Sequence, residues 1–214
     1  MAEGDIGAVV ASLEFDDSNG VCPKIIHIAG NVYAIVYSGV DADGWIKTVT
    51  ISNAGALALV AGGTLEFDEA DCTYPDIIHV AGDVYAIVYT GVLTAGQVKT
   101  VTISDAGALA LVAGGTLEFD AVQGAIPTIV QVYNSVYAIA YCGDTNHGWI
   151  KTVTISAAGA IALVAAGGLE SDAVEGVALN KIRVISKMVW DGSLTTGFFC
   201  EIESVHTKGS WGVP

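Results

Sequence analysis

The stretch Thr64-Leu-Glu-Phe-Asp68 returns as Thr116-Leu-Glu-Phe-Asp120 and, with serine first, as Ser12-Leu-Glu-Phe-Asp16. A weaker copy, Leu169-Glu-Ser-Asp172, follows at the same interval of 52 residues. Prolines, tyrosines and lysines keep this period as well: Pro23, Pro75 and Pro127; Tyr33, Tyr85 and Tyr137; Lys47, Lys99 and Lys151. Four such periods account for nearly all of the 214 residues. Self-similarity at a fixed period of this length indicates a repeat architecture.

Each repeat contains four runs that predict β-strands, in the first repeat at residues 24–29, 32–37, 45–52 and 56–67. The second run is rich in β-branched and aromatic residues, and the third alternates between apolar and polar residues. Turn residues such as Gly30-Asn31 separate the runs, because glycine and asparagine accept the positive φ of tight hairpins. The fourth run has helical propensity, but its Gly-Gly pair and its short length favour a strand.

The fourth repeat is a degenerate copy whose first strand keeps the register. Ile182 is equivalent to Ile26, Ile78 and Val130, while three residues are missing between its first and third strands. The N-terminal stretch 7–16 matches a fourth run, so it can complete the sheet that the C-terminus leaves unfinished. We therefore expect one domain over residues 1–214, with repeats at about 17–68, 69–120, 121–172 and 173–214 and a closing strand at 7–16.

This organisation resembles β-propellers, over essentially the whole chain and at the level of architecture. Four units of about 50 residues resemble the hemopexin-type size class, but no signature of a particular propeller family recurs from unit to unit. The resemblance implies an all-β, four-bladed disc with a central channel and loops on two faces, and it implies no ligand. Two alternatives remain open: a β-trefoil, and half of a larger propeller formed by two chains.

The composition excludes several classes of partner. Hydrophobic residues make up 52% of the chain and charged residues 14%, with 8 Lys and Arg against 23 Asp and Glu, a net charge of −15 and a mean hydropathy of +0.57. Nucleic acid is not an expected partner, because binding it requires a basic face. Insertion into a membrane is not expected either, because the apolar windows are shorter than a bilayer span.

Targeting and cysteine signals are weak. The N-terminus carries acids where a signal peptide carries basic residues, so we expect a chain that is intracellular, borne on a virion or already processed. The four cysteines form no Cys-x-x-Cys pair and occupy no equivalent repeat positions, which gives little support to disulfides or a zinc site: Cys22, Cys72, Cys142 and Cys200.

Candidate ligand-binding residues lie in the loops on one face of the predicted disc. The loops after each fourth strand begin with one aspartate per repeat: Asp16, Asp68, Asp120 and Asp172. These aspartates predict a cation site or a polar rim that binds glycans, unless they only cap their own turns. Asp41 and Asp43 resemble the start of a calcium loop, so Ca²⁺ is a weak cofactor candidate, and no other cofactor is indicated.

Two further sets of residues could bind ligands. A polar position on the first strand recurs in all four repeats and could form a ring in the channel: His27, His79, Gln131 and Arg183. The equivalent residues Trp45 and Trp149 begin third strands beside polar loops, where an indole could stack on a sugar ring. Ordinary packing and hydrogen bonding in the core is the alternative interpretation of both sets.

An enzyme is the least supported class. The glutamate and aspartate of Leu-Glu-Phe-Asp are two residues apart on a strand, so they should share a face, as the carboxylates of a glycosidase do. Every repeat carries this pair, however, whereas catalysis needs one asymmetric site. The composition and repeats instead predict a non-catalytic structural or recognition module within a larger assembly, such as a virion or a surface appendage. Its partners would be proteins or further copies of the chain, and the alternative is a glycan-binding lectin.

Overall fold

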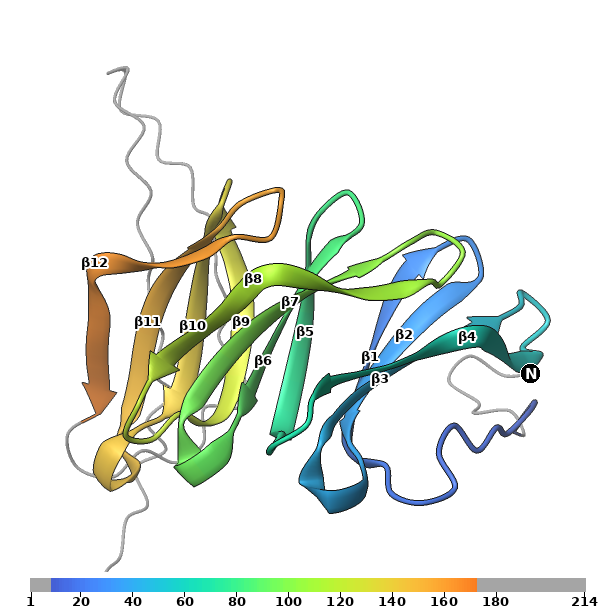
Figure 1. The fold of residues 1–214 in the computed structure, drawn as a ribbon, viewed down its shortest axis with the longest axis horizontal. Helices are drawn as coiled ribbons and strands as arrows, with labels where there is room; N and C mark the ends of the chain where they lie inside the picture. Colours follow the sequence, from blue (N-terminus) through green and yellow to red (C-terminus); the bar gives the residue numbers. More distant parts are fainter. Residues whose placement is uncertain (1–8, 173–214) are drawn as a thin grey trace, which may run out of the picture. The chain divides into compact units, whose positions relative to one another are not determined.

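The computed structural model describes residues 9–172, which fold into three four-stranded antiparallel sheets with almost no helix (Figure 1). The first sheet contains β1 (Val21–Ala29), β2 (Val32–Ser38), β3 (Gly44–Ile51) and β4 (Leu57–Asp68). The second contains β5 (Thr73–Ala81), β6 (Val84–Thr90), β7 (Gly96–Ile103) and β8 (Leu109–Asp120). The third contains β9 (Ala125–Tyr133), β10 (Val136–Cys142), β11 (Gly148–Ile155) and β12 (Ile161–Asp172).

Each sheet is one repeat, and its strands lie side by side in chain order. The four strands predicted per repeat are therefore confirmed in the first three repeats, including the fourth run with its helical propensity. The described sheets are open and none closes into a barrel, unlike the barrel that a β-trefoil would form. The fourth repeat lies outside the described residues, so a four-bladed ring stays a prediction.

The sheets pack face to face, and their cores lie between them. One cluster joins the first and second sheets through side chains such as Ile46, Phe67 and Tyr89. A second cluster joins the second and third sheets. Strand β6 is buried along its whole length, because its sheet is covered on both faces. This double coverage accounts for continuous apolar runs such as Val-Tyr-Ala-Ile-Val-Tyr, and it explains much of the high apolar content.

The hairpin between the second and third strands has the same conformation in every described repeat. A tight turn of three residues fills it: η1 (Val40–Ala42), η2 (Val92–Thr94) and η3 (Asp144–Asn146). In the first of them Asp41 and Ala42 both have positive φ values, of 57° and 68°. Two consecutive residues of this kind give the type I′ geometry that matches the twist of a hairpin. The turn holds the polar loop at one end of each sheet.

The Gly-Gly pair of the fourth strand marks a bend, visible where β4 changes direction in Figure 1. Gly62 has a φ of +72°, a conformation that favours glycine. At Gly63 an added Cβ would lie 1.9 Å from Oγ1 of buried Thr48. That hydroxyl donates a hydrogen bond of 2.8 Å to the carbonyl of Gly107 in the next sheet. The bend therefore lets one sheet contact the β7–β8 turn of the next.

The N-terminal segment lies where the last strand of a preceding sheet would lie. Phe15 packs edge-on against Tyr37, with ring centroids 5.1 Å apart, as Phe67 packs against Tyr89 in the next repeat at 5.5 Å. Residues 9–16 form no strand in the structure. The sheet that they were predicted to complete lies outside the described residues, and so do residues 7 and 8.

Candidate functional site

The repeated aspartate of each Leu-Glu-Phe-Asp motif contacts the sheet that follows it. Asp68 accepts hydrogen bonds at Oδ2 from the hydroxyl of Tyr89 and from Nζ of Lys99, the second at 3.0 Å. Lys99 also donates to the carbonyl of Phe67. We call this arrangement the Asp–Tyr–Lys cluster. It recurs with the same atoms in two other places: Asp16 with Tyr37 and Lys47, and Asp120 with Tyr141 and Lys151.

The second carboxylate oxygen of each aspartate closes its own turn. Oδ1 of Asp120, for example, accepts from the backbone N–H groups of Val122 and Gln123. Desolvation acts to raise the pKa of Asp120, but the hydrogen bonds from Lys151, Tyr141 and the backbone outweigh it, so the pKa is lowered. Protein donors thus engage both oxygens in Asp16, Asp68 and Asp120, and these contacts explain the aspartates without a ligand. The side chain of Asp172 lies outside the described residues.

The glutamate of the motif does not share a face with the aspartate. A one-residue irregularity interrupts the pairing of β7 with β8 between Gly96 and Gln97. As a result Glu118 accepts a hydrogen bond from Gln97 of its own sheet, whereas Asp120 bonds to the third sheet. The expected carboxylate pair on one face is therefore wrong, because the bulge turns the two side chains apart.

The polar residues of the first strands occupy equivalent positions but bond to their own hairpins. His27 lies 3.0 Å from the carbonyl of Gly30, and His79 lies 2.8 Å from that of Gly82. Gln131 donates to the carbonyl of Asn134 at 2.7 Å. All three residues are exposed to solvent. Arg183, the fourth member of the predicted ring, lies outside the described residues.

Trp45 and Trp149 occupy the same register in different surroundings. Both indoles lie over a glycine: an added Cβ at Gly39 would be 2.2 Å from Cδ1 of Trp45, and Gly143 has the same relation to Trp149. Trp149 packs against the core between the second and third sheets, and its Nε1 is buried without a hydrogen-bond partner. Trp45 instead lines a pocket.

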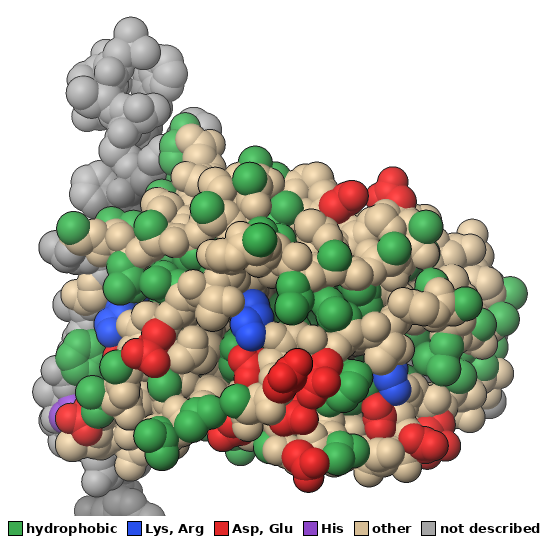
Figure 2. Space-filling model, in the orientation of Figure 1, with side chains coloured by type: hydrophobic (Ala, Val, Ile, Leu, Met, Phe, Trp, Pro, Cys, Tyr) green, Lys and Arg blue, Asp and Glu red, His purple; other side chains and the backbone are tan. Residues whose placement is uncertain are grey.

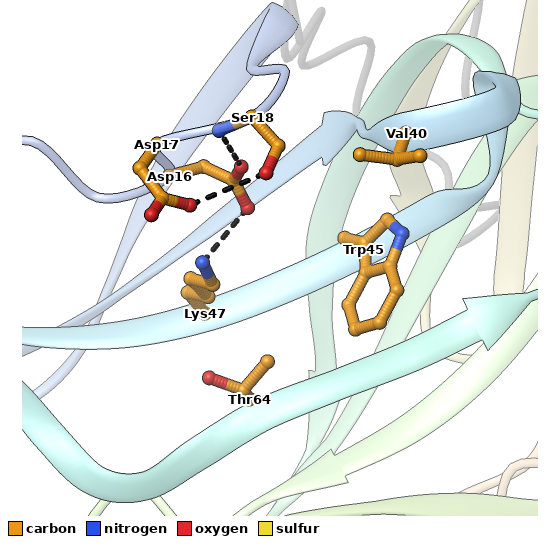
Figure 3. A pocket seen from close by; sticks show the side chains of 7 residues that line it. All are labelled: Asp16, Asp17, Ser18, Val40, Trp45, Lys47 and Thr64. Atoms are coloured by element: carbon orange, nitrogen blue, oxygen red, sulfur yellow. Dashed lines mark hydrogen bonds and ion pairs between the residues drawn. The ribbon is translucent and has the colours of Figure 1, made fainter.

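The pocket beside Trp45 has a volume of about 230 Å³ (Figure 3). Its wall comes from the loop before β1, the η1 turn and strands β3 and β4, through Asp16, Asp17, Ser18, Val40, Trp45, Lys47 and Thr64. Figure 3 shows Lys47 directed at Asp16, while the indole lies between Val40 and Thr64. The hydroxyl of Ser18 donates to Asp17 at 3.2 Å. Sequence reasoning found Trp45 and Asp16 but missed the hydroxyl groups and Asp17.

Negative charge surrounds this end of the sheets. Figure 2 shows most of the visible Asp and Glu side chains in the lower half of the view, with few lysines beside them. Glu66 is the cross-strand neighbour of Trp45. Desolvation, a hydrogen bond with Asp43 and nearby negative charges raise the pKa of Glu66. Among residues 9–172 no group of three or more His, Cys, Asp or Glu side chains is placed to hold a metal ion, Asp41 and Asp43 included.

Comparisons with known proteins give no family for this chain. No protein-family profile matches it, and no curated protein matches it. One solved structure that it resembles is named "Glycoside hydrolase", with 14% identity and a TM-score of 0.35. The match covers 73% of this chain and 39% of that protein, so the chain spans well under half of its length. In the part of the chain that the structure describes, no helix is long and apolar enough to cross a membrane.

Proposed function

We propose that this chain is a non-catalytic recognition module that works inside a larger protein assembly, such as a virion or a surface appendage. One observation carries the proposal: the outer strand of each described sheet presents a half-exposed leucine at the same position. The three leucines are Leu59, Leu111 and Leu163. Neighbouring outer strands contact one another, so the leucines form a row, which we call the leucine row.

The leucine row lies on strands that are sheet edges. Among the strands of residues 9–172, β4, β8 and β12 are each the last strand of their sheet, and no described strand pairs with their outer side. An exposed edge with apolar side chains is a template for a partner chain, and burial by that partner removes the hazard of aggregation. The low content of charged residues, 14%, offers little other protection from association.

The repeated ionisable groups have structural roles that favour this interpretation over catalysis. The clusters of Asp68 and Asp120 hold neighbouring sheets together, and the cluster of Asp16 holds the N-terminal segment against the first sheet. The cluster is also the same in the three repeats that the structure describes, whereas a catalytic site needs asymmetry. A rigid stack with an apolar row suits a scaffold that displays loops.

The fold proposed for the whole chain is the four-bladed propeller. The packing of Phe15 against Tyr37 supports this fold, because the N-terminal segment makes the contact that a preceding sheet would make. Small-angle X-ray scattering of the full chain tests it, since a closed disc is shorter in its longest dimension than an open stack. A longest dimension that fits only an open stack would refute the ring.

Analytical ultracentrifugation of the full chain over a range of concentrations tests the assembly role. We expect association that the change Leu111→Lys weakens, because a lysine in the row opposes burial. Leu93→Lys is the matched control, since Leu93 is 87% exposed in the η2 turn and lies outside the row. A chain that stays monomeric at every concentration, or association that Leu111→Lys leaves unchanged, would contradict the proposal.

A further inference from the structure

The repeats provide an internal comparison that separates scaffold from site. Positions that hold the sheets together are the same in all three described repeats, as the Asp–Tyr–Lys cluster shows. The pocket positions beside the cluster differ. The first repeat has Asp17, Ser18, Trp45 and Thr64; the second has Glu69, Ala70, Gln97 and Thr116; the third has Ala121, Val122, Trp149 and Gly168. Only the first combines an indole, two hydroxyl groups and a carboxylate.

From this comparison we propose that the pocket of the first repeat binds a single uncharged pyranose ring. The C–H face of a pyranose is apolar and its rim carries hydroxyl groups, so it fits an aromatic surface flanked by hydrogen-bonding side chains. Trp45 supplies the aromatic surface. Ser18 and Thr64 offer hydroxyl groups, and Asp17 offers a carboxylate that accepts from sugar hydroxyls.

The size of the pocket limits the ligand to one ring. Its volume is about 230 Å³, which is below the roughly 300–1,000 Å³ of sites that enclose drug-sized ligands. A longer glycan would place one residue here and leave the others in solvent. The site would therefore recognise a terminal or side-branch sugar, and the affinity of a single site would be low.

The charges around the pocket exclude acidic sugars. Lys47 is the cation in the wall, and it already donates to the carboxylate of Asp16 and to the carbonyl of Phe15. Asp17 in the wall and Glu66 beside Trp45 add negative charge. A sialic or uronic acid would place its carboxylate among like charges, which disfavours it.

The second repeat shows how the site looks when another sheet packs in front of it. The first sheet covers the inner part of that repeat, while Gln97, Thr116 and Glu118 keep access to solvent. In the third repeat the equivalent Trp149 packs against the core between the second and third sheets. Among residues 9–172 no sheet packs in front of the first repeat, and the site does not depend on assembly through the leucine row.

Saturation-transfer NMR on the full chain tests the site with four neutral probes, the methyl glycosides of glucose, galactose, mannose and N-acetylglucosamine, and with N-acetylneuraminic acid. We expect transfer to at least one neutral glycoside and none to the acid. Trp45→Ala should abolish the signal, and Ser18→Ala should weaken it. Gln97→Ala, at the equivalent position of the second repeat, should leave it unchanged.

Three results would overturn the inference: no transfer to any of the four glycosides, a signal that survives Trp45→Ala, or equal binding of the acid. Circular dichroism of each variant shows whether the sheets remain folded. Ser18→Ala gives a second measurement should Trp45→Ala not fold, because the Ser18 side chain lies in the loop and bonds only to Asp17 among the contacts described above. Full signal in Ser18→Ala together with an unfolded Trp45→Ala would count against the site.

Discussion

Removing the charge of Asp68 should loosen the contact between the first and second sheets. In Asp68→Asn the amide keeps an oxygen for the turn, but Lys99 loses its counter-ion and the Tyr89 hydroxyl loses its charged acceptor. The Lys99 and Asp68 side chains are only 17% and 16% exposed, so water compensates poorly. A hydrogen bond to a charged group contributes about 1.5–3 kcal/mol. We therefore expect Asp68→Asn to lower the free energy of unfolding by about 2 kcal/mol.

Two further variants divide this value into its parts. Tyr89→Phe removes one hydrogen bond to the carboxylate and should cost about 1.5 kcal/mol. Asp68→Ala also removes the turn contacts with the backbone of Ala70 and Asp71, and should cost about 3–4 kcal/mol, in the range for breaking a buried pair. Asp83→Asn, in the exposed hairpin between β5 and β6, is the control and should cost nothing measurable.

Urea denaturation followed by circular dichroism measures these differences, because the midpoint falls with stability when the slope is unchanged. Hydrogen exchange then locates them, and Asp68→Asn should speed exchange at the amides of β4 and β6 more than at those of β11. An Asp68→Asn protein with the same midpoint as the parent would refute the reasoning. It would mean that the desolvation of the ion pair cancels its attraction.

Three other outcomes follow from the packing and the charges. Gly115→Ala should lower the free energy of unfolding by more than about 2 kcal/mol, because the new Cβ would lie 2.0 Å from Oγ1 of Thr100. At Gly114 a Cβ meets open space, so Gly114→Ala should cost only about 1 kcal/mol, through its φ of +71°. Thermal unfolding of the two variants measures the difference. Folding lowers the pKa of the three aspartates in the Asp–Tyr–Lys clusters. Their contribution to stability is therefore complete above about pH 4 and is lost as the pH falls below it. A urea midpoint that does not drop on acidification would contradict this. Burial and the negative charges of nearby aspartates raise the pKa of the Cys72 thiol. A thiol reagent at neutral pH should therefore modify half-exposed Cys142 well before Cys72. Mass spectrometry of the labelled peptides measures the two rates.

The strands could be predicted because their signals are local. Alternating apolar residues and Gly or Asn turns placed the strands of the first repeat within a few residues of their observed bounds, for example 45–52 against β3 (Gly44–Ile51). The fourth run was predicted correctly from its Gly-Gly pair, which the structure uses for the bend at Gly62 and Gly63.

The contacts between sheets could not be predicted in the same way. The partners of Asp68 lie 21 and 31 residues away, on two different strands of another sheet. Tyr37, Tyr89 and Tyr141 do keep the 52-residue period, so a search for polar residues that recur together would have found the set. The bulge that separates Glu118 from Asp120 depends on strand pairing and has no sequence signal of its own.

The pocket was predicted in part. Trp45 was recognised from its position beside a polar loop, but Asp17, Ser18 and Thr64 reach it from segments far apart in the sequence. The useful signal was the difference between repeats, because a position that holds different residues in otherwise similar units is less constrained by the common packing.

The Asp–Tyr–Lys cluster gives the array a direction. The first and second sheets each end in a phenylalanine and an aspartate that contact the next sheet, the third sheet has Ser171 in place of the phenylalanine, and the N-terminal segment supplies Phe15 and Asp16 to the first sheet. Units of 52 residues that end in Leu-Glu-Phe-Asp can therefore be duplicated or deleted whole, since each new junction between them has the same complementary ends as the old one. Gene duplication can thus change the number of units without a new interface, and a single unit is free to acquire a pocket while its neighbours preserve the stack.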